Sequence, residues 1–373
     1  MTDYIRSIDI KSFRGIKDLK LNDLMPINVL TGDNNCGKTS VLEILESFSA
    51  PDNFRIWRSL LRKDNGTSLS RGMSYYEGFY DLFNVSSEKK CLEYTIETEI
   101  ETSQVVLSAW EDVEELTEEE YAKISGLSYL KEEDNCEIAT LLVPKLQMEI
   151  CINGESVNTY SVYDGQYRFP FLTKGYGEAR NSSQKRNVIY ISPIRHAEGN
   201  LFLRSVLDYP ELYEQMLSIL QEYDENIISI NYDNDDNNVS GRGIYKILSR
   251  DHEKALPLNV YGDGMKKAVL LMSAVIKAQN GILLLDEFET AIHTSAMEKT
   301  FRWILETCMK LNVQLFLTSH SKEAIEKVLK CAPDIQEKIA VYTLYKDKEG
   351  MSVRRLTGKK AIMVQEDMGL ELR

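Results

Sequence analysis

The sequence predicts an α/β fold in which a mixed, largely parallel core sheet is joined to an antiparallel β region. Two largely apolar segments that end in polar residues, 281–287 and 313–320, alternate with amphipathic helical segments, a pattern typical of a helix-covered parallel sheet. The segment 26–32 is also apolar and runs directly into a glycine-rich turn. Several segments between 91 and 163 alternate apolar and polar residues, which predicts antiparallel strands with one solvent-facing side.

The first half of the chain divides into three regions. Residues 1–49 predict three strands and a helix, and residues 50–90 form an irregular region that we interpret as a helical insert. Residues 91–192 predict the antiparallel region, ending in the short apolar strand 187–192. An acidic helix-like insert over 112–134 interrupts these strands.

The second half is more regular. We expect a helical subdomain over 193–260, because 210–223 has the spacing of an amphipathic helix. Residues 261–373 predict two helices that alternate with the two apolar strands, followed by a hairpin that turns near 348–350. The helices are expected over 264–279 and 295–311.

Composition excludes several classes of protein. The formal net charge of −14 argues against a surface coated for nonspecific nucleic-acid binding. Six scattered cysteines without CxxC pairs, and only four histidines, suggest neither a disulfide framework nor a zinc site. No run approaches the ~18 apolar residues needed to cross a bilayer, and the N-terminal segment lacks the pattern of a secretion signal. We therefore expect a cytoplasmic protein without a membrane partner.

A complete phosphate-binding motif lies at 32–39, where GDNNCGKT follows an apolar strand and precedes a helix. Gly32 and Gly37 allow the backbone to fold around phosphate oxygens, so that N–H groups and the helix N-terminus supply positive potential. Lys38 is expected to bridge the β- and γ-phosphates of a nucleotide, and Thr39 to offer its hydroxyl to Mg²⁺. A glycine turn with a solvent-exposed lysine is the alternative, which the agreement of strand, motif and helix disfavours.

Two carboxylates end the apolar strand 281–287. Asp286 is placed to hold Mg²⁺ through a water molecule, and Glu287 to act as the general base that polarises the attacking water. The pair is weak as a signal by itself, but it is strong after a complete phosphate-binding loop.

The strand 313–320 brings Thr318, Ser319 and His320 to the same sheet edge. Ligands of parallel sheets bind beyond the carboxyl ends of the strands, so the three strand ends are expected to converge on one site. His320 would then sense the γ-phosphate of a nucleotide. A purely structural histidine at a strand end is the alternative.

The segment 259–272, NVYGDGMKKAVLLM, places Gly262, Asp263 and Gly264 at the start of a helix. A Gly-Asp-Gly cluster is usually a surface turn. Its exposed N–H groups and the helix dipole would also suit an anion.

Taken in order, these motifs resemble the ABC-type ATPase heads of the RecF, SMC and OLD group, particularly the bacterial AAA-15 ATPases. The resemblance is carried by SFRG, GDNNCGKTS, YGDGMKK, LLLDEFE and LTSH, whereas residues 50–185 carry no motif that we can assign. It implies that 1–373 is a single P-loop NTPase head that binds ATP and Mg²⁺ and forms a homodimer or a higher oligomer when ATP is bound.

The resemblance also implies roles for individual residues. Gly32–Ser40, including Asn34, Asn35 and Ser40, would be the Walker A loop, Asp286 and Glu287 the Walker B pair, and His320 the switch histidine. Arg14 would approach the nucleotide phosphates, and Gly262, Asp263 and Gly264 would cap the γ-phosphate held by the partner subunit. Glu289 and His293 lie in the segment that resembles the D-loop, and Ser192 and Arg195 occupy a place suited to a contact between lobes.

Only about fifty residues follow His320, too few for the TOPRIM nuclease domain of OLD proteins. The sequence therefore favours the ATPase subunit of an anti-phage or toxin–antitoxin-like system that controls a separate nuclease or toxin. The alternative is a DNA-binding repair ATPase like RecF, whose basic surface would come from 174–186, with Lys174, Arg180, Lys185 and Arg186. A solvated loop explains that segment equally well. A small-molecule kinase is disfavoured, because the carboxylate pair and the Gly-Asp-Gly segment suit hydrolysis between subunits.

Overall fold

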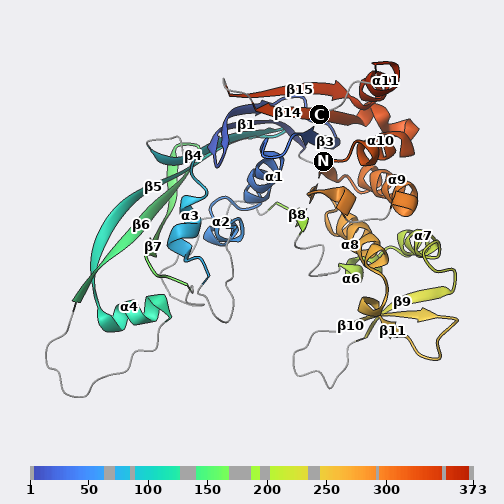
Figure 1. Cartoon of the computed structure of the whole chain (residues 1–373), viewed down its shortest axis with the longest axis horizontal. Coiled ribbons are helices and arrows are strands. Elements are labelled where there is room, and N and C mark those ends of the chain that lie inside the picture. The colour runs from blue at the N-terminus through green and yellow to red at the C-terminus, as the bar shows by residue number, and fades with distance from the viewer. Residues whose placement is uncertain are drawn as a thin grey trace.

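The computed structural model describes residues 4–62, 72–84, 89–126, 140–167, 186–193, 202–233, 244–290, 294–346 and 350–368. Within these residues the strands form two six-stranded sheets and one three-stranded sheet. Figure 1 shows the antiparallel sheet extending to one side of the molecule and most of the helices gathered on the other. No helix in the described ranges combines the length and the apolar character needed to span a membrane.

The core sheet has the strand order β15-β14-β3-β13-β12-β8. Its strands from β14 to β8 run parallel, and β15 pairs antiparallel with β14, so the predicted mixed sheet is confirmed. All parallel strands end at the same sheet edge, which is where the site is built. The strand bounds are β3 (Ile27–Gly32), β8 (Val188–Ile191), β12 (Ile282–Leu285), β13 (Gln314–Thr318), β14 (Ile339–Lys346) and β15 (Met351–Thr357).

Helices cover both faces of this sheet. On one face the apolar sides of the C-terminal helices share one core cluster with the sheet. On the other face α1 (Lys38–Ser47) lies between the core sheet and the antiparallel sheet, and nearly all of its residues are buried. The C-terminal helices are α8 (Asp263–Lys277), α9 (Thr294–Lys310), α10 (Lys322–Cys331) and α11 (Gly358–Met368). The short 3₁₀ helix η1 (Leu258–Val260) precedes α8, and η2 (Phe288–Thr290) and η3 (Pro333–Lys338) lie between the later helices.

The antiparallel sheet has the order β2-β1-β4-β5-β6-β7. The expected acidic helix over 112–134 is wrong for its first part, because residues 112–117 continue strand β5 and pair with β6 as far as Thr117↔Thr140. The helix α4 (Glu118–Ser125) begins only at a capping box formed by Thr117 and Glu120. The strand bounds are β1 (Ile5–Phe13), β2 (Ile16–Leu21), β4 (Lys90–Thr98), β5 (Thr102–Thr117), β6 (Thr140–Ile152) and β7 (Glu155–Tyr163).

Two connecting regions complete the fold. The region 50–90 contains the short helices α2 (Phe54–Ser59) and α3 (Tyr75–Tyr80). The region 193–260 differs from the expected helical subdomain, because its helices are followed by the three-stranded sheet β11-β10-β9. Its elements are α6 (Leu203–Val206), α7 (Pro210–Leu220), β9 (Ile227–Asp233), β10 (Ile244–Ser249) and β11 (Leu256–Pro257).

Candidate functional site

The phosphate-binding loop connects β3 to α1 through two glycines that no other residue could replace without strain. Gly32 has a φ of 133°, and a Cβ atom there would lie 2.3 Å from the carbonyl oxygen of Leu344. Gly37 has a φ of 90°, and its Cβ would lie 2.9 Å from the side chain of Ile16. The loop is therefore held between β14 and the start of β2, and α1 begins directly after it.

Lys38 points back into this loop. Its Nζ donates hydrogen bonds to the backbone oxygens of Gly32, at 2.8 Å, and Asp33, at 2.9 Å. The side chain is buried, so these bonds compensate for taking an ammonium group out of water. Nucleotide phosphates placed at the loop would offer the same ammonium group charged acceptors, which form stronger hydrogen bonds than carbonyl groups.

Asp286 is buried at the end of β12 and is held by three hydroxyl groups. Its Oδ1 accepts hydrogen bonds from the Oγ1 atoms of Thr318, at 2.5 Å, and Thr39, at 3.3 Å. Its Oδ2 accepts one from the hydroxyl of Tyr190 in β8, at 3.2 Å. Burial and the nearby Asp286 carboxylate raise the pKa of Tyr190 far above its ordinary value, so the phenol keeps its proton.

The donors near Asp286 suit Mg²⁺. The described residues contain no group of three or more His, Cys, Asp or Glu side chains that could hold a metal ion by themselves. Mg²⁺ typically keeps several waters and uses one or two carboxylates together with substrate phosphates. The Thr39 hydroxyl and the Asp286 carboxylate, which face each other beside the phosphate-binding loop, fit that requirement.

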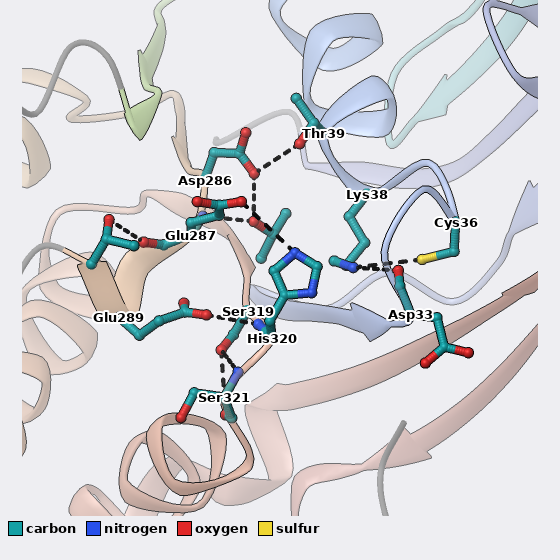
Figure 2. Close-up of polar contacts among 12 residues, drawn as sticks. Asp33, Cys36, Lys38, Thr39, Asp286, Glu287, Glu289, Ser319, His320 and Ser321 are labelled. Carbon is teal, nitrogen blue, oxygen red and sulfur yellow. Dashed lines mark hydrogen bonds and ion pairs between the residues drawn. The ribbon is translucent and has the colours of Figure 1, made fainter.

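Glu287 and His320 face each other across the mouth of the site (Figure 2). Oε1 of Glu287 lies 3.8 Å from Nε2 of His320, and both side chains are more than a third exposed. The backbone of Glu287 has a φ of 49°, a conformation unusual for a residue with a side chain, and its N–H donates to Thr318 Oγ1 at 2.8 Å. This local turn directs the Glu287 carboxylate out of the sheet and toward the solvent-accessible space.

One cavity of about 750 Å³ joins these groups. Lys38 lines this cavity, whereas Gly32 and Asp286 are not among its lining residues. The sequence-predicted residues that line the cavity are Arg14, Asn34, Asn35, Gly37, Lys38, Thr39, Ser40, Glu287 and His320.

Two further positively charged side chains, which the sequence patterns did not indicate, also line the cavity. Arg62 comes from the region after α2, and Lys346 from the end of β14, where its Nζ lies 3.4 Å from the backbone oxygen of Gly15. The buried carboxylate of Glu43 in α1 pairs with Arg14 and with Arg62, at 3.0 Å in each case. The sequence did contain a signal for a nearby cation, namely the carboxylate of Glu43 on the side of α1 that is buried. A buried carboxylate needs a positively charged partner.

The Gly-Asp-Gly segment is not part of this cavity. Gly262 and Asp263 are exposed at the start of α8, where Asp263 pairs with Lys266 at 2.6 Å. Lys267 donates to the backbone oxygen of Thr290 at 2.6 Å, which links α8 to the segment after β12. Gly262, Asp263 and Gly264 are thus outside the cavity that the phosphate-binding loop of their own chain lines.

The other predicted residues have different outcomes. Glu289 accepts a hydrogen bond from the backbone N–H of His320 at 2.7 Å, so it supports the histidine within the same chain. Ser192 directly follows β8, whereas His293 and Arg195 lie outside the described residues. Of the basic residues in 174–186, only Arg186 is described. It forms an ion pair with Glu101 and stacks on Phe48, with its guanidinium carbon 4.0 Å from the ring centre.

Comparisons with known proteins indicate an ATPase domain. The sequence model described as an AAA ATPase domain matches residues 4–141, and the one described as an AAA domain, putative AbiEii toxin, Type IV TA system, matches 163–326. An ATP/GTP phosphatase of Helicobacter pylori is 25% identical over 341 residues, which cover 86% of each chain.

Two solved structures are similar at low sequence identity. The Smc head domain with an extended coiled coil, bound to the C-terminal domain of ScpA from Pyrococcus furiosus, has a TM-score of 0.49 and 10% identity over 99% of this chain and all of that chain. The recombination mediator protein RecF of the RecFOR pathway has a TM-score of 0.44 and 14% identity over 96% of this chain and all of that chain.

The phosphate-binding loop, the carboxylate pair and the AAA-domain matches define the chain as a P-loop ATPase. The match of residues 4–141 to the AAA ATPase domain model agrees with the resemblance to AAA-15 ATPases stated from the sequence.

Proposed function

We propose that the protein is an ATP-dependent homodimeric switch that controls a separate effector protein. The observation that carries this proposal is that Gly262, Asp263 and Gly264 lie outside the cavity lined by the phosphate-binding loop of the same chain. Gly262 provides no side-chain cap for α8. The Met265 N–H donates to the oxygen of Gly262, so the first N–H groups of the helix, those of Asp263 and Gly264, are the ones that an anion would contact. A second copy of the chain could supply that anion as the γ-phosphate of its bound nucleotide, which would place each active site between two subunits.

Each residue at the site has a separate role in the proposed hydrolysis of ATP. Lys38 and the N-terminus of α1 would stabilise the β- and γ-phosphates of ATP, and Thr39 and Asp286 would hold Mg²⁺. When bound, Mg²⁺ supplies positive charge to the phosphate oxygens. Glu287 orients a water molecule and accepts its proton, while His320 contacts the γ-phosphate from the other side.

The effector role is supported by one of the family matches. Residues 163–326 match a model whose description names a putative AbiEii toxin of a Type IV toxin–antitoxin system. We propose that the ATP-bound and ATP-free forms of this chain expose different surfaces to a nuclease or toxin made as a separate polypeptide.

The variant Glu287→Gln tests the nucleotide switch. It keeps the size and polarity of the side chain but removes the base, so we expect ATP hydrolysis to fall by roughly 10²- to 10⁴-fold while ATP binding persists. ATP-bound dimers should accumulate, as measured by light scattering after size exclusion.

Glu253→Gln, at an exposed glutamate outside the cavity, is the matched control. Lys38→Ala should fail to bind ATP. Undiminished hydrolysis in Glu287→Gln would remove the general-base assignment.

The effector proposal needs a separate test. The chain is co-expressed with the product of a neighbouring gene, and bacterial growth and resistance to phage are compared with those of Lys38→Ala. A difference between the two strains is expected. If the chain hydrolysed ATP, bound no neighbouring product and protected cells equally well with Lys38→Ala, the effector role would be wrong while the ATPase assignment would stand.

A further inference from the structure

The carboxylate of Asp286 is held from both sides by the strands that flank β12. The core sheet places β13 and β8 next to β12, one on each side. Thr318 at the end of β13 donates to Oδ1 of Asp286, and Tyr190 in β8 donates to Oδ2. Each carboxylate oxygen therefore has its own donor from a different neighbouring strand.

The sheet register explains how Tyr190 reaches this carboxylate. Tyr190 pairs with Leu284, which precedes Asp286 by two residues and therefore shares its face of the sheet. Side chains in strands lean along the strand direction, and a tyrosine is long enough to extend past one residue pair. The backbone N–H of Asp286 also donates to the oxygen of Ile191 at 3.0 Å, which fixes β8 against the end of β12.

Packing alone does not require a hydroxyl group at this position. The ring of Tyr190 belongs to an apolar cluster that includes Leu284 and Phe316, and it is 8% exposed. Phenylalanine would fill the same space without the cost of burying a polar group. The hydroxyl is placed where it satisfies the inner oxygen of a carboxylate that is itself only 2% exposed.

We propose that Tyr190 is a positioning residue for the metal-binding carboxylate. Its hydrogen bond fixes Oδ2 of Asp286 and keeps Oδ1 directed at Thr39, the two groups that would hold Mg²⁺. This inference rests on the proposed assignment of Thr39 and Asp286 to the metal. Partners that orient a metal-binding carboxylate from outside contribute to affinity for the metal as well as to activity.

The test is Tyr190→Phe, with Mn²⁺ as a spectroscopic substitute for Mg²⁺. Binding of Mn²⁺ to the full-length protein in the presence of a non-hydrolysable ATP analogue is titrated by electron paramagnetic resonance. We expect the Kd for Mn²⁺ to rise by about ten- to a hundredfold. Binding of the same analogue in EDTA should not change, and the Mg²⁺ concentration that gives half-maximal hydrolysis should rise more than the KM for ATP.

Tyr94→Phe is the matched control. Tyr94 is fully buried in the same apolar cluster, and its hydroxyl lies 2.8 Å from Ser47 Oγ, so its loss removes a buried hydrogen bond without touching Asp286. Both variants should show a small decrease in thermal stability, and only Tyr190→Phe should lose affinity for Mn²⁺.

Unchanged Mn²⁺ affinity in Tyr190→Phe, with the wild type binding Mn²⁺ and nucleotide normally, would overturn the role of Tyr190 alone. Equal losses in both tyrosine variants would also overturn it, because they would indicate a general effect of packing. A wild type that binds no nucleotide with Mn²⁺ would instead contradict the proposed function.

Discussion

Two pairs of glycines in this chain have opposite surroundings. Gly32 and Gly37, in the phosphate-binding loop, have positive φ angles, and a Cβ at either would lie within 3 Å of an atom of the same chain. Gly262, at the start of α8, has an ordinary φ of −61° and no atom within 4 Å of its Cβ position. Gly264 is similar, since its Cβ would only contact Tyr223 at 3.6 Å.

This difference shows at which positions the single chain itself requires glycine and at which positions it does not. The loop glycines are fixed by their own backbone and by the strands around them, because larger residues would be strained or would collide. Nothing described in the monomer requires glycine at 262 or 264. A requirement for small residues there would have to come from another molecule, which is the reason we place a second subunit at that surface.

The largest expected effect is that of Gly32→Ala. The added methyl group would collide with the oxygen of Leu344 at a φ of 133°, so we expect the free energy of unfolding to fall by about 3 kcal/mol and ATP binding to be lost. Thermal unfolding and binding of a fluorescent ATP analogue measure the two effects.

Gly154→Ala serves as the control for Gly32→Ala. Gly154 also has a positive φ, 82°, but no atom within 4 Å of its Cβ position. It should lose only about 1 kcal/mol from backbone strain and should bind ATP normally. Normal ATP binding by Gly32→Ala would show that the loop tolerates a side chain, and the contrast between the glycine pairs would disappear.

The second effect is that of Gly264→Arg. A Cβ at this position would make only an ordinary contact with Tyr223, at 3.6 Å, so thermal stability and ATP binding should change little. ATP-dependent dimerisation should be abolished, and hydrolysis should fall to the rate of the isolated subunit, as measured by light scattering and phosphate release. Glu211→Arg places the same side chain at the exposed second position of α7 and should leave hydrolysis intact. If Gly264→Arg hydrolysed ATP normally, the segment would be an ordinary turn.

The smallest effect is that of Gly264→Ala. Alanine favours helix over glycine, and the position lies at the second residue of α8 with room for a methyl group. We expect the free energy of unfolding to rise by up to about 1 kcal/mol, as measured by urea unfolding. A decrease in stability would mean that the monomer itself needs glycine there, which would weaken the inference of a partner.

The strands and loops at the site could be predicted because their signals are local. The segment 32–39 combines an apolar strand, spaced glycines and a helix start within a few residues, and 281–287 combines a buried strand with two carboxylates. The convergence of these segments with His320 followed from the rule that parallel strands end at one sheet edge. The structure brings all three segments to that edge.

The errors occurred where long-range pairing overrides local composition. Residues 112–117 are acidic and compatible with a helix, but pairing with β6 extends β5 through them. In 193–260 the amphipathic helix was clear, whereas β9 and β10 pair with each other across a connection that the sequence pattern did not identify as a turn. Propensity is a weak guide wherever hydrogen bonding to a distant strand decides the conformation.

By itself, the sequence determined the phosphate-binding loop, the carboxylate pair, the mixed α/β fold and the relation to AAA-type ATPases, because each depends on short patterns read in order. Only the tertiary structure placed Arg62 and Lys346 in the cavity and the hydroxyl of Tyr190 against Asp286. These residues come from separate regions with no motif of their own. Their positions depend on which strands become neighbours in the sheet and on how the connecting segments pack against α1, and such contacts between distant residues leave no periodic signal along the chain.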